Sequence, residues 1–220
     1  MMSSHVSPDL EARAVCGRSH PCLAGLTGGL ASGKSTVARM LAARGASVFD
    51  ADAGVHDLYR PGKAGARVVA ELFGDQVLDA EGGVDRRALG HLVLQDADAR
   101  LRLETEIHPL VRAMVAAWRE SLGPVQVAVV EAALLVETGA WRNYDVLIVV
   151  WCEPNQQLDR AQARGMPLER ARRLLAAQLP FEEKKRHAHV VVDNRGSLED
   201  LGAEIDCAWS EIRAHCADRR

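Results

Sequence analysis

A glycine-rich stretch, Gly28-Gly29-Leu30-Ala31-Ser32-Gly33-Lys34-Ser35, contains the residues whose chemistry is easiest to recognise in this sequence. It fits the pattern GxxxxGK[ST], in which backbone N–H groups surround a phosphate, a lysine reaches the outer phosphates and a hydroxyl holds Mg²⁺. Lys34 and Ser35 occupy the last two positions of this pattern. The motif predicts that the chain binds ATP or GTP together with Mg²⁺.

Two other sequence features favour ATP and a small-molecule kinase. Proteins that recognise guanine use an Asn/Thr-Lys-x-Asp loop, and residues 193–196, Asp-Asn-Arg-Gly, have no lysine in that place. Switch and partitioning ATPases with a second lysine early in the loop would need it near Gly28 or Gly29, where this chain has none. A kinase that phosphorylates a small molecule is therefore the leading class.

An Asp-Ala-Asp sequence, residues 50–52, follows the second apolar run of the chain. A kinase uses a carboxylate to orient or deprotonate the acceptor hydroxyl, and the carboxyl ends of parallel strands face the ligand crevice. Aspartate is also a common helix N-cap. We assign Asp52 to the acceptor, and Asp50 to the cap or to a water-mediated Mg²⁺ contact.

The elements that must position these residues follow from the apolar pattern. Short runs rich in Val and Ile at 22–27, 46–50, 125–131, 146–151 and 189–193 predict five strands, and helical stretches separate them. Runs that are apolar almost throughout are typical of a parallel sheet covered on both faces. We predict an α/β fold of the P-loop kinase type, a five-stranded parallel sheet flanked by helices, with a helical insertion at 59–122 and a closing helix at 198–215.

Composition excludes several classes of protein. The chain has 220 residues, 48% of them hydrophobic, a net charge of −3 and a pI near 6.2, so general binding to nucleic acid or to an anionic membrane is not expected. Its five cysteines are scattered without a CxxC pair, which suggests neither a disulfide framework nor a zinc site and favours a reducing cytoplasm. Residues 1–20 lack the apolar core of a signal peptide, and we expect a disordered leader there.

Several further segments, together with the loop, resemble the dephospho-coenzyme A kinase family in order along the chain. They are GLTGGLASGKST, FDADAGVHDL, HPLV, EAALLVE, EEKKRHAHVVVDN and GSLEDL. The resemblance implies transfer of the γ-phosphoryl group of ATP to the ribose 3′-hydroxyl of dephospho-coenzyme A, which gives coenzyme A and ADP. The family usually has a glycine where this chain has Ala31 and a proline where it has Ala133.

The resemblance also implies a layout and a set of site residues. The nucleotide-binding core would comprise residues 21–58, 123–152 and 182–220, the coenzyme-A-binding insertion 59–122 and a lid 153–181. Asp52, Lys34 and Arg164 would be catalytic, and the substrate would contact Asp52, Arg86, His108, Arg112 and Glu137. ATP would be bound by Gly29, Ala31, Ser32, Gly33, Lys34, Ser35 and Thr36, and Mg²⁺ by Ser35, with Glu131 as a second candidate.

Several of these residues also have a purely structural interpretation. Arg86 can belong to a solvated helix face, and His108 can be held by packing near a helix start, with Pro109 in the first turn. Glu131 can cap the helix expected after the third strand, and Glu137 can be an exposed residue of that helix.

The expected lid has a local excess of positive charge. From Asp159 to Arg186 the chain has eight cationic and four acidic side chains, a local charge of +4 in a chain of net charge −3. Such an excess is suited to closing over a polyphosphate.

The cofactors expected are ATP and Mg²⁺, and we expect a cytoplasmic monomer. Two other functions stay open at this point: a nucleoside or nucleotide kinase on the same scaffold, and an ATP-dependent interaction module without an acceptor. A panel of acceptors in an ADP-release assay separates all three.

Overall fold

Five strands form one sheet in the order β2-β3-β1-β4-β5 in a computed structural model, which describes residues 20–122 and 127–218. The strands are β1 (Cys22–Gly28), β2 (Ser47–Asp50), β3 (Val127–Glu131), β4 (Val146–Trp151) and β5 (Val190–Asp193). All five predicted strands are present, and the parallel sheet with flanking helices is confirmed. Residues 1–19 of the leader expected at 1–20, and the predicted strand start at Val125, lie outside the described residues.

The register of the sheet brings three strand ends to one edge. In the parallel pair β1 and β4, Gly28 lies opposite Val150, and in the parallel pair β4 and β5, Trp151 lies opposite Asp193. The loops that leave these strands therefore begin side by side at the carboxyl edge of the sheet, the edge where open α/β sheets bind ligands.

The chain divides into two compact units. Unit 1 comprises residues 1–48, 122–129 and 133–220, and unit 2 comprises 49–121 and 130–132. Unit 1 contains α1 (Lys34–Ala42), η4 (Ala140–Asn143), α6 (Pro154–Ala163), α7 (Leu168–Ala176), α8 (Phe181–Lys185) and α9 (Leu198–Asp218). The predicted closing helix is thus confirmed as α9, which extends three residues further than expected.

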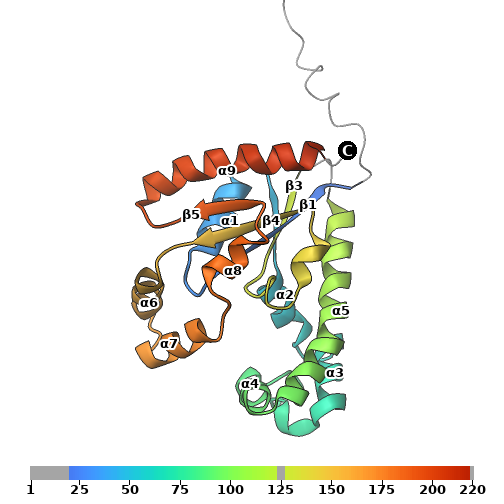
Figure 1. Cartoon of the computed structure of the whole chain (residues 1–220). Helices are drawn as coiled ribbons and strands as arrows, with labels where there is room; N and C mark the ends of the chain where they lie inside the picture. The colour runs from blue at the N-terminus through green and yellow to red at the C-terminus, as the bar shows by residue number, and fades with distance from the viewer. Residues whose placement is uncertain (1–19, 123–126, 219–220) are drawn as a thin grey trace, which may run out of the picture. The chain divides into compact units, whose positions relative to one another are not determined.

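The core of unit 1 lies between the sheet and the helices α1 and α9. Leu26 and Ile148 of the strands are fully buried in one cluster with Val37 of α1 and Ile205 of α9. Figure 1 shows α9 running alongside β4 and β5. Because this face is fully apolar, burial of these side chains is the main stabilising contribution to the sheet.

On the other side of β1, a loop covers the sheet where a helix was expected. A Cβ atom added to Gly25 would lie 2.8 Å from Leu135 Cδ1 and 3.0 Å from the Tyr144 ring, so this strand position has room only for glycine. Burial raises the pKa of Tyr144 to about 12. Residues 133–138 form consecutive turns, so the helix predicted after the third strand is wrong.

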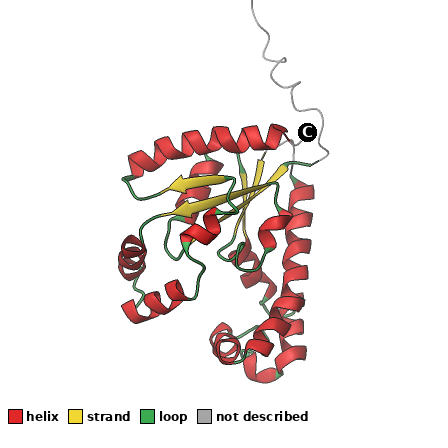
Figure 2. Cartoon of the chain, viewed as in Figure 1, coloured by secondary structure: helices red, strands yellow, loops and turns green. Residues whose placement is uncertain are grey.

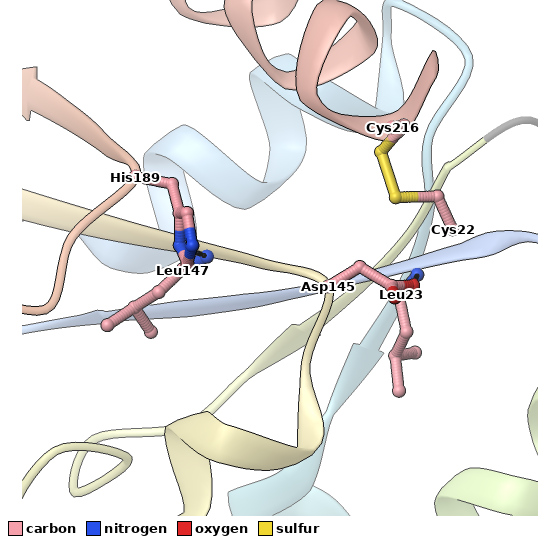
Figure 3. Close-up of a disulfide and its surroundings, with 6 residues drawn as sticks. All are labelled: Cys22, Leu23, Asp145, Leu147, His189 and Cys216. Carbon is pink, nitrogen blue, oxygen red and sulfur yellow. Dashed lines mark hydrogen bonds between the residues drawn. A yellow bond between two sulfur atoms is a disulfide. The ribbon is translucent and has the colours of Figure 1, made fainter. Parts of the chain in front are cut away.

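A disulfide joins Cys22, at the start of β1, to Cys216, near the end of α9 (Figure 3). The expectation that no cysteines pair was wrong, because the two residues are 194 positions apart and only the packing of α9 brings them together. Cys152 is buried and free, and Cys207 is exposed and free. Next to the disulfide, the Leu23 N–H donates to Asp145 Oδ2 at 2.9 Å.

His187 and His189, just before the start of β5, both pack against other rings. His189 accepts the Leu147 N–H through Nδ1 at 2.9 Å, and its ring lies edge-on to that of His215. The His187 ring stacks on Trp141 with ring centroids 4.6 Å apart. Both histidines thus make packing contacts.

Unit 2 consists mainly of helices joined by loops, as Figure 2 shows. They are α2 (Ala51–Leu58), α3 (Ala64–Phe73), η3 (Asp75–Val77), α4 (Arg86–Gln95) and α5 (Ala97–Ser121). Val69 and Phe73 of α3, Leu89 of α4 and Ile107 of α5 are buried together in a second core. This core packs α3, α4 and α5 against one another, so the surface residues of these helices have fixed positions within unit 2.

Within residues 20–122 and 127–218, no helix combines the length and the apolar character needed to cross a bilayer.

Candidate active site

The predicted phosphate loop connects β1 to α1, which is the strand-loop-helix context that the motif requires. The Lys34 ammonium donates to the backbone oxygens of Gly28, at 3.3 Å, and Gly29, at 3.0 Å. The Ser32 N–H donates to the Gly29 oxygen at 3.2 Å, which closes the turn. Lys34 therefore lies against the loop itself, at the start of α1, where the helix dipole favours an anion.

Two amide side chains lie directly against the backbone of the loop. Gly33 has φ +101°, and a Cβ atom there would overlap the amide nitrogen of Asn194. A Cβ atom on Gly29 would lie 2.6 Å from Gln157 Oε1. The Asn194 amide also donates to the Ser32 oxygen at 2.7 Å. Glycine is needed at positions 29 and 33 because the side chains of Gln157, in α6, and of Asn194, just after β5, lie so close to the backbone of the loop.

Three buried polar atoms around the loop have no hydrogen-bond partner among the described residues: Ser32 Oγ, Gln157 Oε1 and Arg160 Nη1. The other terminal nitrogen of Arg160 donates to the Asn194 oxygen at 2.9 Å. Leaving a buried polar group unsatisfied costs about 1–3 kcal/mol. These unsatisfied atoms, together with the loop, fit a site that a polar ligand such as a nucleotide completes.

Ala31 is the only non-glycine residue with positive φ in the described part of the chain, at +49°. Glycine would be favoured at this position, because a left-handed conformation costs a residue with a Cβ about 1–2 kcal/mol.

We expect Ala31→Gly to stabilise the protein by about 0.5–1 kcal/mol, after the larger unfolded-state entropy of glycine is deducted. Differential scanning calorimetry should show a melting temperature about 1–4 °C higher, given the size of the protein. Ala43→Gly, at a position with φ −63° at the end of α1, is the matched control and should lower the melting temperature. A lower melting temperature for Ala31→Gly would contradict the strain at this position.

Arg164 lies at the end of α6, in the turn that the sequence predicted between two helices. It is the C-cap of α6, Gly165 follows with φ +82°, and α7 begins at Leu168. The side chain is exposed, and within residues 20–122 and 127–218 it makes no hydrogen bond or ion pair. In contrast, Arg172 pairs with Glu169 at 3.0 Å on the exposed side of α7. The Arg164 guanidinium thus has no competing ionic partner in this part of the chain.

Glu137 has contacts inside unit 1. Its Oε1 lies 2.7 Å from Lys184 Nζ and accepts the Leu179 N–H at 3.3 Å. Lys184 is 2% exposed and Glu137 15%, so this is a nearly buried ion pair. From the sequence we expected Glu137 to be a helical residue that is either exposed or faces the substrate. Nothing in the sequence pattern indicated that it pairs with Lys184.

In unit 2, Asp50 and Asp52 differ in their surroundings. Asp50 is the N-cap of α2, and its Oδ1 accepts the Ala53 N–H at 2.9 Å. Asp52 is exposed in the first turn of α2. Its carboxylate is not needed for the cap.

The Arg86 side chain contacts a histidine that sequence analysis did not consider. Arg86 is the first residue of α4, and its Nη1 donates to His56 Nδ1 at 3.0 Å. His56 lies one helical turn after Asp52 on α2, so both are on one face of that helix. Burial raises the pKa of the nearby Tyr59, and Arg86 partly offsets this. The four-residue spacing between Asp52 and His56 in the sequence could have indicated that the two side chains lie on one face of a helix.

His108 and Arg112 lie in the middle of α5, four residues apart and therefore on one face. His108 is half-buried and Arg112 is exposed. Pro109 lies inside this 25-residue helix, so the interpretation that placed it in a first turn was wrong. The helix continues because packing in unit 2 supports it, even though proline removes one internal hydrogen bond.

The two candidate metal ligands are each at the end of a strand or the start of a helix. Ser35 is the second residue of α1, and Glu131, 8% exposed, is the last residue of β3. Groups of three or more acidic, histidine or cysteine side chains suited to a metal do not occur among the described residues.

A five-stranded parallel sheet with a lysine- and serine-containing phosphate loop after its central strand defines a P-loop nucleotide-binding protein. Comparison with known proteins narrows this class. The family model for dephospho-CoA kinase (CoaE) matches residues 22–200. The chain belongs to the dephospho-CoA kinase family.

Individual relatives agree with this assignment over most of their length. The dephospho-CoA kinase of Frankia casuarinae is 43% identical over 190 residues, which cover 86% of this chain and 83% of the relative. That of Geobacter sulfurreducens is 42% identical over 192 residues, which cover 85% and 96%. Among solved structures, the dephospho-CoA kinase of Campylobacter jejuni superimposes with a TM-score of 0.63 at 27% identity and covers 87% of this chain and 97% of its own. The Thermus thermophilus protein TT1252 superimposes with a TM-score of 0.78 at 33% identity, covering 88% and 98%.

The activity that follows is the phosphorylation of dephospho-coenzyme A at its ribose 3′-hydroxyl by ATP, the last step of coenzyme A biosynthesis. The family, the reaction and the class of enzyme that we expected from the sequence are confirmed.

Proposed function

We propose that the loop between β1 and α1 holds the triphosphate of ATP, with contacts from Gly29 and from residues 31–36. The observation that carries this proposal is the group of buried, unsatisfied polar atoms around a loop whose lysine lies against its own backbone. Lys34 would turn from the Gly28 and Gly29 oxygens to the outer phosphates. Its charge would then offset the charge that the transferred phosphoryl group develops.

We propose that Ser35 contributes a hydroxyl ligand to Mg²⁺, with Glu131 as a second candidate ligand. A bound Mg²⁺ supplies charge neutralisation to the phosphates. Ser35 suits this role because it is exposed at the start of α1, directly after Lys34. ADP release measured with Mg²⁺ in excess and then with EDTA tests the requirement, and full activity in EDTA would exclude it.

We propose that Asp52 is the carboxylate that receives the proton of the 3′-hydroxyl. As the hydroxyl oxygen bonds to the γ-phosphorus, the bond from that phosphorus to the β,γ-bridging oxygen breaks and ADP leaves. Asp52 lies exposed in the first turn of α2, and the neighbouring Asp50 supplies the helix cap. Phosphoryl transfer is accelerated mainly by positioning of the reactants and by electrostatic stabilisation. A carboxylate that orients the nucleophile contributes to the positioning and also provides a negative charge that can take up the proton.

We propose that unit 2, mainly its insertion at 59–122, binds dephospho-coenzyme A. Arg112 and His108 share one face of α5, and Arg86 is a second exposed cation at the start of α4. Guanidinium groups pair well with the substrate's pyrophosphate. We further propose that α6 and α7 act as a lid, and that the enzyme works as a cytoplasmic monomer.

An acceptor panel tests the substrate assignment. Purified protein is given ATP and Mg²⁺ with dephospho-coenzyme A, adenosine, AMP or 3′-deoxy-dephospho-coenzyme A, and ADP release is followed. Only dephospho-coenzyme A should support turnover. Equal turnover with adenosine or AMP would contradict the assignment of the acceptor site, and turnover with the 3′-deoxy compound would contradict the position of transfer.

We expect Arg164→Ala to lower the single-turnover rate on the order of 10²-fold or more, with little change in the Kd for ATP, by analogy with arginine fingers. A planar cation at the end of α6 stabilises the spread charge of the transition state more than that of the ground state. Arg164→Lys should recover part of the rate.

Arg172→Ala is the matched control for Arg164, because Arg172 already pairs with Glu169 on an exposed helix face. It should change the rate by less than about three-fold. Full turnover of Arg164→Ala with weaker ATP binding would instead make Arg164 a clamp on the ground state.

A further inference from the structure

The segment 178–185, which follows the lid helix α7, is attached to the phosphate loop by a side chain. Gln178 Oε1 accepts the N–H of Leu30, the third residue of the loop motif, at 2.8 Å. The Gln178 N–H in turn donates to the Leu175 oxygen of α7 at 3.2 Å. Gln178 therefore links the end of α7 to a backbone donor within the phosphate loop.

The position of Gln178 depends on its neighbours in the same segment. The next N–H along the chain, that of Leu179, donates to Glu137 Oε1 at 3.3 Å. The ring of Phe181 stacks on Trp151, with centroids 4.9 Å apart, which fixes the start of α8 at the end of β4. These two contacts hold the backbone on the carboxyl-terminal side of Gln178.

Glu137 is itself held by an ion pair that is almost fully removed from water. Lys184 Nζ lies 2.7 Å from Glu137 Oε1, and the lysine is 2% exposed. Glu137 Oε2 and Lys184 Nζ are both buried without a hydrogen-bond partner among the described residues, so the two side chains are held together by charge attraction. A pair with an unsatisfied oxygen is a poor source of stability, because apolar residues of similar volume are often as good or better. Its geometry, however, fixes the carboxylate that accepts the Leu179 N–H.

We propose that Glu137 and Lys184 are positioning residues for the phosphate loop, acting through Leu179 and Gln178 on the N–H of Leu30. The chain of contacts runs from the ion pair to a backbone donor of the loop without a gap. The loop binds phosphate with successive N–H groups, so a shift in one of them weakens the whole nest. Displacement of the Gln178 side chain should therefore weaken ATP binding first.

A double-mutant cycle with Glu137→Gln and Gln178→Met tests this chain of contacts. We expect each single variant to raise the KM for ATP about 10-fold, since a displacement of about 1 Å in a positioned group can cost up to about 10²-fold. The KM for dephospho-coenzyme A should stay within about two-fold of the parent. In the Gln178→Met background, Glu137→Gln should add nothing, because the link that transmits its effect is already missing.

Glu183→Gln is the matched control, because Glu183 pairs with Arg186 on the same helix at 2.7 Å but with both side chains well exposed. It should leave both KM values within about two-fold of the parent. An unchanged KM for ATP in Gln178→Met, or additive effects in the cycle, would overturn the proposal. A higher KM for dephospho-coenzyme A alone in Glu137→Gln would also overturn it and would place Glu137 at the acceptor.

An apolar replacement separates positioning from stability. Glu137→Leu with Lys184→Met removes both charges together and should keep the melting temperature within a few degrees of the parent, or raise it. The KM for ATP should nevertheless rise about 10-fold, as in the single variants, because the Leu179 N–H loses its acceptor. A stable apolar pair with a normal KM for ATP would show that the ion pair is only structural. If the Glu137→Leu, Lys184→Met double variant does not fold, the double-mutant cycle with Glu137→Gln and Gln178→Met still tests the proposal.

Discussion

Replacing Lys34 by alanine is expected to lower kcat/KM on the order of 10³-fold or more, while the protein stays folded. The Lys34 ammonium donates to the backbone oxygens of Gly28 and Gly29, and the side chain does not belong to the apolar core of unit 1. Its loss therefore removes charge from the phosphate site without opening a cavity. Steady-state kinetics with varied ATP, together with circular dichroism and a melting curve, measure both parts of the expectation.

Lys63→Ala is the matched control for Lys34, because it removes an exposed lysine at the start of α3 that pairs with Asp57 at 3.7 Å. Its kcat/KM should stay within about two-fold of the parent. A well-folded Lys34→Ala enzyme with near-normal turnover would defeat the assignment of the loop between β1 and α1 as the triphosphate site.

Asp52→Asn is expected to lower kcat about 10²–10⁴-fold, the range for removing a general base, with little change in the Kd for ATP. Asparagine keeps the shape of the side chain but cannot accept the proton of the 3′-hydroxyl at neutral pH. Pre-steady-state rates with saturating ATP and dephospho-coenzyme A isolate this step, and fluorescence titration or calorimetry gives the ATP affinity.

Asp50→Asn provides an unusually close comparison, because it makes the same chemical change two residues earlier. Asparagine is as good an N-cap as aspartate, so the contact to the Ala53 N–H is kept. Activity should stay within about two-fold of the parent. If Asp50→Asn loses its activity while Asp52→Asn keeps it, the two aspartates have exchanged roles.

The features that could be predicted from the sequence are those with a local cause. The phosphate loop follows from residue types at fixed spacing, and the five strands follow from short runs of buried apolar residues. The cap at Asp50 and the turn after Arg164 follow from residues within a few positions of each other. The loop, the strands, the cap and the turn all depend on conformational preferences that are determined by a short segment of sequence.

The features that were missed depend on packing between distant segments. Gln178 reaches Leu30 across 148 positions, and Asn194 reaches the loop at Ser32 across 162. The disulfide and the Glu137 to Lys184 pair have the same cause. The turns at 133–138 and the uninterrupted α5 through Pro109 show the reverse case, in which tertiary packing overrides a local preference.

The disulfide between Cys22 and Cys216 makes the described core a covalently closed ring. A protease that cuts the exposed turn at Gly165 would produce two fragments that stay joined until a thiol reductant is added. A loop of this length lowers the entropy of the unfolded chain by an amount worth about 5 kcal/mol in the chain-entropy estimate. The cleaved chain would therefore keep β5 and the other four strands at an effective concentration that no pair of separate fragments could reach.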